Sequence, residues 1–319
     1  IGYALAPVVA HNQALGKSYR PELFFEANIE ELHKASQHER FFFATHACFL
    51  HAPGDRNYPW SQMYDQNGYR KFNRLRYSRS GTKLVFSEGD ADAPVYVVAE
   101  QDYKVYDSGI AMADGMVKRI VEELKKSGLY DNTVIVLLSD HGENLWEKDL
   151  PYKYHGPNHG FHPYGDGQHQ VVFAIRFPDG KFSGTEISDP VRLIDLAPTL
   201  AEYFQLDWNS DVDGKSLFSL MRGEEEEVRE VYIETGMSEP NYWPDGHREY
   251  SYKRIAERYW IRPDNHWVMV RDEFLPELLA GKDRVFQMGK WKLVWRPMTE
   301  GEPIIQLFNR ADDSENRFD

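Results

Sequence analysis

Apolar residues recur at helical spacing in two long segments of the chain. One stripe of apolar positions runs through polar residues from Pro21 to Glu39, and a longer one runs from Val95 to Lys126. Apolar residues three or four positions apart lie on one face of an α-helix. Ser127-Gly128 follows the second segment, and glycine commonly ends a helix. The pattern therefore predicts a helix over each segment.

Short, nearly continuous apolar runs predict the strands. Such runs cover Phe41–Ala47, Thr133–Leu138 and Val171–Phe177. A continuous run of this length is typical of a buried strand. For Thr133–Leu138 we expect a place in a parallel sheet, since parallel strands are usually covered on both faces. A further helix is predicted over Asp189–Phe204, with its Asp-Pro start supplying the N-cap and the first helical position.

The composition of the chain changes beyond the acidic run Glu224–Glu227. Aromatic-rich short segments alternate there with turns, at Val231–Glu234, Lys290–Trp295 and Ile304–Phe308. Short strands separated by turns favour an antiparallel sheet. We therefore divide the chain into an α/β domain over residues 1–222 and a small α+β subdomain with an antiparallel sheet over residues 223–319.

Composition and charge exclude several classes of protein. The chain is 41% hydrophobic and 28% charged, which is typical of a globular protein rather than a disordered one. Its net charge of −14 gives it no general attraction for nucleic acid or an anionic membrane surface. No apolar run is long enough for stable membrane insertion. The single cysteine, Cys48, rules out an intrachain disulfide and a cysteine-based zinc site.

The segment Leu138–Leu145, with the sequence LSDHGENL, carries the strongest chemical signal. It follows a predicted strand, and ligands of open α/β sheets bind where strands end. Asp140 offers an oxygen ligand and His141 a nitrogen ligand, while Gly142 allows the backbone to turn sharply. Glu143 is placed to orient one of these two side chains. We expect half of a divalent-metal site here, with Asp140 and His141 as metal ligands.

Several segments, taken in order, resemble the second half of a catalytic domain of the sulfatase family, which belongs to the alkaline phosphatase-like superfamily. The resemblance spans about Phe41 to Phe318. It is carried by Tyr106–Ile110 with Asp114, Leu124–Thr133, Ser139–Glu143, Val191–Leu200, Asp213–Leu217, Lys290–Val294, Leu307–Asn309 and Asp312–Asn316. It implies a doubly wound alkaline phosphatase-like sheet, of which this chain holds part, and a small carboxyl-terminal subdomain. It also implies one divalent metal ion, with calcium, manganese and zinc not distinguished.

The resemblance also points to histidines that contact the substrate. His51, followed by Pro53, best matches the family's substrate-side histidine, and His46 is the weaker candidate. In the later loop His159-Gly160 fits the family's His-Gly best, and His155-Gly156 competes with it. A histidine at such a position can donate to a sulfuryl or phosphoryl oxygen, or to the leaving group. We expect His51 and His159 to be catalytic.

One departure from the family is large. Its nucleophile lies in a Cys/Ser-x-Pro-x-Arg stretch, or at a Thr/Ser in phosphoryl-transfer relatives, and this chain has no such stretch. Cys48 precedes Phe-Leu-His-Ala-Pro, which does not fit. The chain also begins at Ile1 rather than Met. We therefore expect a missing amino-terminal half of the same protein to supply the nucleophile and further acidic ligands.

Three functions follow from the resemblance. The first is a metal-dependent hydrolase that cleaves a sulfate ester, of a small molecule or a glycan, through a covalent intermediate. The second is a phosphodiesterase, phosphonate hydrolase or phosphoethanolamine-type transferase of the same superfamily. The Asp-His pair slightly favours this function, because imidazole suits zinc or manganese better than calcium. The third is a non-catalytic relative. Oligomeric state and location stay open, although the resemblance is compatible with a periplasmic or extracellular protein.

Overall fold

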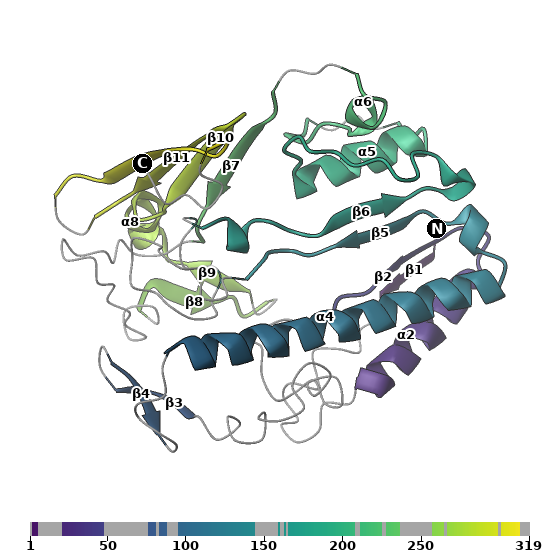
Figure 1. The fold of residues 1–319 in the computed structure, drawn as a ribbon, viewed down its shortest axis with the longest axis horizontal. Coiled ribbons are helices and arrows are strands. Elements are labelled where there is room, and N and C mark those ends of the chain that lie inside the picture. Colours follow the sequence, from purple (N-terminus) through teal and green to yellow (C-terminus); the bar gives the residue numbers. More distant parts are fainter. Residues whose placement is uncertain are drawn as a thin grey trace. The chain divides into compact units, whose positions relative to one another are not determined.

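The computed structural model describes the chain in segments, shown in Figure 1. They are residues 2–5, 21–47, 76–80, 83–87, 95–143, 159, 163, 165–207, 211–224, 228–236, 257–264, 267–298 and 301–312. The chain divides into two compact units, Ile1–Thr133 and Val134–Asp319. The predicted domain boundary at residues 222 and 223 falls inside the second unit and stays a prediction.

The first unit is built on the two predicted helices. Helices α2 (Pro21–Ser36) and α4 (Val95–Lys126) pack against each other, with α2 along the second half of α4 (Figure 1). Their apolar stripes meet in a buried cluster of Phe24, Phe25, Met112 and Met116. Removing such side chains from water stabilises the packing by roughly 1.5–3 kcal/mol each. Both helix predictions are confirmed.

Short strands and one turn complete the described part of the first unit. Strand β2 (Phe41–Ala44) follows α2 and pairs in parallel with β1 (Gly2–Leu5). Strands β3 (Arg76–Ser80) and β4 (Lys83–Ser87) form an antiparallel pair. A 3₁₀ turn, η3 (Tyr130–Asn132), follows α4.

The second unit begins with two predicted strands, which are antiparallel rather than part of the expected parallel sheet. Strand β5 (Ile135–Leu138) pairs antiparallel with β6 (Phe173–Arg176), with Ile135 opposite Arg176. We expected the first of these strands to lie in a parallel sheet and to be buried, yet Leu137 and Leu138 are exposed. A continuous apolar run indicates a strand but not its direction. Here the chain returns along β5 without a crossover helix among the described residues.

The predicted helix over Asp189–Phe204 begins later than expected. A 3₁₀ turn, η6 (Leu193–Asp195), leads into α5 (Leu196–Tyr203). The N-cap interaction comes from inside the segment, because the Asp195 carboxylate accepts the backbone N–H of Arg192 at 2.9 Å. The expected cap at Asp189 is therefore wrong, since a buried carboxylate farther along takes its place. The Pro178-Gly180 turn, η5, precedes this region.

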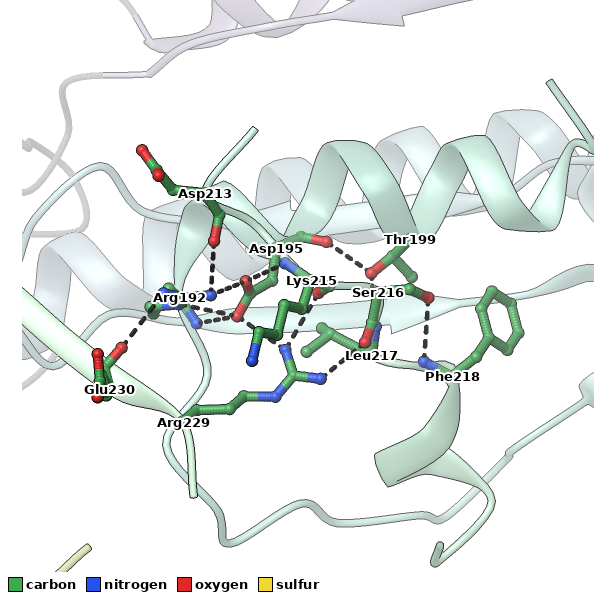
Figure 2. Close-up of polar contacts among 10 residues, drawn as sticks. All are labelled: Arg192, Asp195, Thr199, Asp213, Lys215, Ser216, Leu217, Phe218, Arg229 and Glu230. Carbon is green, nitrogen blue, oxygen red and sulfur yellow. Dashed lines mark hydrogen bonds and ion pairs between the residues drawn. The ribbon is translucent and has the colours of Figure 1, made fainter. Parts of the chain in front are cut away.

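Asp195 is the centre of a buried polar network, drawn in Figure 2. Its Oδ1 accepts hydrogen bonds from Nη2 of Arg192 at 2.8 Å and from the backbone N–H of Lys215 at 2.9 Å. Its Oδ2 lies 3.2 Å from Nη1 of Arg229. Burial alone would raise the pKa of Asp195, but the Arg192 hydrogen bond and the backbone donors lower it overall. The network holds the loop before α6 (Phe218–Met221) against the start of α5.

The carboxyl-terminal part of the second unit contains the predicted antiparallel sheet. Four strands lie in the order β12-β11-β10-β7, each antiparallel to its neighbour. Their bounds are β7 (Glu230–Glu234), β10 (Arg284–Met288), β11 (Trp291–Arg296) and β12 (Ile304–Asn309). The core of this sheet is Val285, Val294 and Phe308. We did not predict β10, in which Arg284 and Gln287 interrupt the apolar pattern.

Smaller elements stand between β7 and β10. Strands β8 (Tyr259–Ile261) and β9 (Val268–Val270) form an antiparallel pair. The 3₁₀ turn η7 (Asp272–Phe274) leads into α8 (Leu275–Ala280). The described residues thus form a mixed α/β structure. They do not show a continuous doubly wound sheet, which stays a prediction for the full domain.

Candidate functional site

The Asp-His-Gly-Glu loop starts directly where β5 ends. The backbone N–H of Ser139 donates to the carbonyl of Val172 at 3.1 Å, and the N–H of Val172 donates to Oγ of Ser139 at 3.1 Å. These two bonds hold the first loop residue to Val172, the residue that precedes β6. Asp140 therefore leaves the sheet from a fixed point, and its carboxylate is 65% exposed. An exposed carboxylate at a strand end is available to a ligand.

Gly142 is required by its surroundings rather than by its backbone angles. Its N–H donates to the carbonyl of Gln168 at 2.8 Å. A Cβ atom at this position would lie 1.9 Å from the carbonyl oxygen of Gly167 and 2.9 Å from that of Gln170. The 3₁₀ turn η4 (Asp166–Gln168) thus packs directly on the loop. Only glycine allows this approach.

The ring of His141 is oriented by the loop itself. Its Nδ1 lies 2.7 Å from the carbonyl oxygen of Gly142, and a carbonyl can only accept, so Nδ1 carries the proton. The lone pair of the neutral ring is then on Nε2. This atom lies 3.9 Å from Oδ1 of Asp140. The two predicted ligands therefore present an oxygen and a nitrogen to the same side of the loop.

His159 joins this group from the following loop. Its Nδ1 donates to Oε2 of Glu143 at 2.7 Å. The Glu143 side chain is only 5% exposed, so its carboxylate has few positions open to it. The rings of His141 and His159 stack, with centroids 4.1 Å apart and planes at 24°. Glu143 thus orients His159, one of the predicted substrate contacts.

The remaining predicted histidines lie outside the described part of the second unit. His46 is exposed and follows β2 in the first unit. His51 and His155 lie outside the described residues. Their predicted roles stay predictions.

A second group of charged residues, which we did not predict, surrounds Asp166 of η4. Nζ of Lys292 is 2.7 Å from Oδ1 of Asp166, and Nη2 of Arg310 is 2.6 Å from Oδ2. Burial would raise the pKa of Asp166, but the two cations outweigh it and lower the pKa. Burial lowers the pKa of Lys292, against the pull of Asp166. Gly165-Asp166 and Lys290-Trp291-Lys292 both stand out in the sequence, but no local pattern indicates that Asp166 and Lys292 form an ion pair.

The donor set of the loop fits a divalent cation in part. Ligand atoms lie about 2.0–2.2 Å from a bound zinc ion, so two ligands of a tetrahedral site lie about 3.4 Å apart. The 3.9 Å between Asp140 Oδ1 and His141 Nε2 is somewhat wider, so a small movement of the two side chains would let them share one ion. No group of three or more His, Cys, Asp or Glu side chains arranged for a metal occurs among the described residues. The remaining ligands would have to come from other residues.

Comparison with known proteins assigns the family. The family described as Sulfatase matches residues 7–206, which is more than half of the 319 residues. The chain belongs to the sulfatase family. This confirms the resemblance on which the site prediction was based.

The relatives extend beyond this chain. Steryl-sulfatase of Rattus norvegicus is 29% identical over 125 residues, which cover 37% of this chain and 22% of that protein. A sulfatase of Formosa agariphila is 27% identical over 175 residues, covering 54% of this chain and 32% of that protein. The phosphonate monoester hydrolase of Agrobacterium radiobacter has a similar fold, with a TM-score of 0.57 and 17% identity over 94% of this chain and 56% of that one. The chain therefore spans less than two thirds of each of these proteins.

The last similarity supports the fold prediction at the level of an α/β fold shared with that phosphonate monoester hydrolase. Within the described segments, no helix has the length and apolar character needed to cross a membrane.

Proposed function

We propose that this sulfatase-family chain is part of a metal-dependent sulfuric ester hydrolase. The observation that carries the proposal is the grouping of Asp140, His141 and His159 at the end of β5. Family membership makes ester hydrolysis the expected reaction. The nucleophile and further acidic ligands are proposed to lie in another part of the full protein.

Asp140 and His141 are the proposed metal ligands. The Nδ1 hydrogen bond of His141 to the Gly142 carbonyl presents Nε2 with its lone pair, as a ligand to a metal requires. A divalent ion bound here would polarise the ester and favour attack on it. Among the described residues, Asp140 supplies one oxygen donor and His141 one nitrogen donor.

His159 is the proposed substrate contact. The Glu143 carboxylate fixes its ring through a hydrogen bond to Nδ1. A positioned imidazole can donate to a sulfuryl oxygen or to the leaving oxygen. Stacking on His141 keeps the ring within a few ångströms of the proposed ligand pair. His51 is proposed to make a second contact of this kind, with His46 and His155 as weaker candidates.

Phosphoryl or phosphonyl transfer is the second candidate. The observation that favours it is the imidazole of His141 beside Asp140, because nitrogen ligands suit zinc and manganese better than calcium. The similar fold of a phosphonate monoester hydrolase is compatible with this reaction. The proposed substrate is in either case an anionic ester of a small molecule or a glycan.

A substrate panel tests the proposal. The full-length protein would be assayed with an aryl sulfate, an aryl phosphate diester and an aryl phosphonate monoester, with manganese, calcium or zinc added. We expect the sulfate to have the highest kcat/KM, and Asp140→Asn to abolish turnover. Faster cleavage of the phosphorus esters would favour the second candidate. Absence of turnover on all three would favour a non-catalytic relative.

A further inference from the structure

The carboxylate of Asp166 is held from the carboxyl-terminal sheet. Lys292, the second residue of β11, donates through Nζ to Oδ1 at 2.7 Å. Arg310, just past β12, donates through Nε and Nη2 to Oδ2 at 3.1 and 2.6 Å. Both carboxylate oxygens are thus bonded to cations that lie 126 and 144 residues away in the sequence. Charge-assisted bonds of this kind are among the stronger ones in proteins.

The cations are themselves fixed in place. The Lys292 side chain is 1% exposed, and its backbone lies opposite Phe308 in the core of the sheet. The backbone N–H of Arg310 donates to the carbonyl of Lys290 at 2.7 Å, so Arg310 continues the β11–β12 pairing. Asp166 is therefore bound to a rigid support rather than to mobile surface chains.

Asp166 in turn sets the position of η4. It is the first residue of this turn, and its backbone carbonyl accepts the N–H groups of His169 and Gln170 at 2.9 and 2.8 Å. The turn is packed against the Asp-His-Gly-Glu loop, through the Gln168 carbonyl that accepts from Gly142. No side chain intervenes, because a Cβ at Gly142 would collide with Gly167.

We propose that Lys292 and Arg310 are positioning residues, which hold the loop of Asp140 and His141 in place through Asp166 and η4. The carboxyl-terminal sheet then acts on the candidate site without contacting substrate or metal. The chain of contacts runs from Lys292 to Asp166, from η4 to Gly142, and from there to the two neighbouring ligands. The inference rests on the proposed function for its consequence in metal binding.

A matched pair of substitutions on β11 tests this role in the full-length protein. Lys292→Met removes the cation from Asp166 and keeps most of the length of the side chain. Arg296→Met is the control, because Arg296 is the last residue of the same strand, is equally buried and pairs with Asp283 at 3.3 Å. Each variant removes a buried cation of β11 and so breaks one ion pair. Only the first loses a bond to η4.

Two measurements separate positioning from stability. Hydrogen exchange of the segment 138–143 reports whether the Gly142 N–H bond to η4 opens, and manganese titration reports the candidate ligands. We expect Lys292→Met to exchange this segment at least tenfold faster and to bind manganese about tenfold more weakly, since supporting residues of metal sites have effects of this size. Arg296→Met should leave both values near those of the parent protein.

Asp166→Asn provides a second route if Lys292→Met does not fold, and it should give the same two changes. Unchanged exchange at Gly142 in either variant would overturn the positioning role, as would equal effects from Arg296→Met. Failure of the proposed metal site is distinguishable, because Asp140→Ala would then leave manganese affinity unchanged while the exchange data still decide the role of Lys292.

Discussion

Glu143 and His159 are joined by a 2.7 Å hydrogen bond between Oε2 and Nδ1. The carboxylate is almost fully buried while the imidazole is 26% exposed, so the bond runs from the interior toward the surface. A buried carboxylate that orients an exposed imidazole is a common arrangement around reactive histidines. Substitution of Glu143 therefore tests the role of His159.

Removing the Glu143 carboxylate should impair catalysis more than folding. In Glu143→Ala the His159 ring loses its acceptor, and we expect kcat to fall about 10–100-fold with a smaller change in KM. Glu143→Gln keeps an acceptor oxygen and should lose less. Steady-state kinetics on the best substrate of the panel measures kcat and KM for both variants. Equal activity of Glu143→Ala and the parent protein would argue against a role for His159.

A methyl group at Gly142 should disrupt the loop. In Gly142→Ala the new Cβ would lie 1.9 Å from a backbone oxygen of η4, so the turn must move. Forcing an extra carbon into a packed site costs about 1–3 kcal/mol of unfolding free energy. Urea denaturation measures this loss. Gly236→Ala is the control, because a Cβ there meets nothing within 4 Å and should change little.

The Asp195 network should be a main support of the second unit. In Asp195→Ala the side chain of Arg229, which is 2% exposed, keeps its charge but loses its carboxylate. Loss of one partner of a buried pair costs about 3–5 kcal/mol. Glu224→Ala is a suitable control, because it breaks the surface pair with Arg222. A small change for Asp195→Ala in urea denaturation would contradict the importance given to the network.

His169 should make stability depend on pH in the acid range. Burial, and then the nearby Lys292 charge, lower its pKa from 6.5 to about 4, despite the Pro163 carbonyl that accepts its hydrogen bond. Between pH 6.5 and about 4, His169 is therefore protonated in the unfolded chain and neutral in the folded chain. This contribution to stability is complete above pH 6.5 and is lost as the pH falls, by about 3 kcal/mol in all.

Urea denaturation at a series of pH values measures the slope. His169→Asn can keep the hydrogen bond to Pro163 but cannot take up the proton, so its stability should fall less between pH 6.5 and 4. The exposed His38, replaced by Asn, is the matched control. Parallel pH curves for His169→Asn and the parent protein would show that His169 is not responsible.

The sequence predicted the elements whose signals are local. Helix α4 begins and ends at the residues that its apolar stripe marked. The site residues Asp140, His141 and His159 came from residue types at a predicted strand end and from the family resemblance, and the structure groups them. Glu143 was expected to orient Asp140 or His141, and the structure shows it bonded to His159.

Features that depend on distant parts of the chain could not be predicted in this way. Strand β5 pairs antiparallel with β6, which follows it in the chain, and an apolar run does not indicate the direction of the partner strand. The start of α5 is set by Asp195, whose partners include Lys215 and Arg229. The bond of Lys292 to Asp166 joins residues 126 positions apart, and neither local pattern indicates it.

The central claim is that Asp140 and His141 hold a divalent cation. Calorimetric titration of the full-length protein with manganese, calcium and zinc tests it most directly, with Asp140→Ala and His141→Ala as variants. Asp207→Ala removes an exposed carboxylate just beyond α5 and is the control. We predict one tight, stoichiometric site that either variant weakens at least a hundredfold and that the control leaves intact. Unchanged metal affinity in Asp140→Ala would contradict the claim.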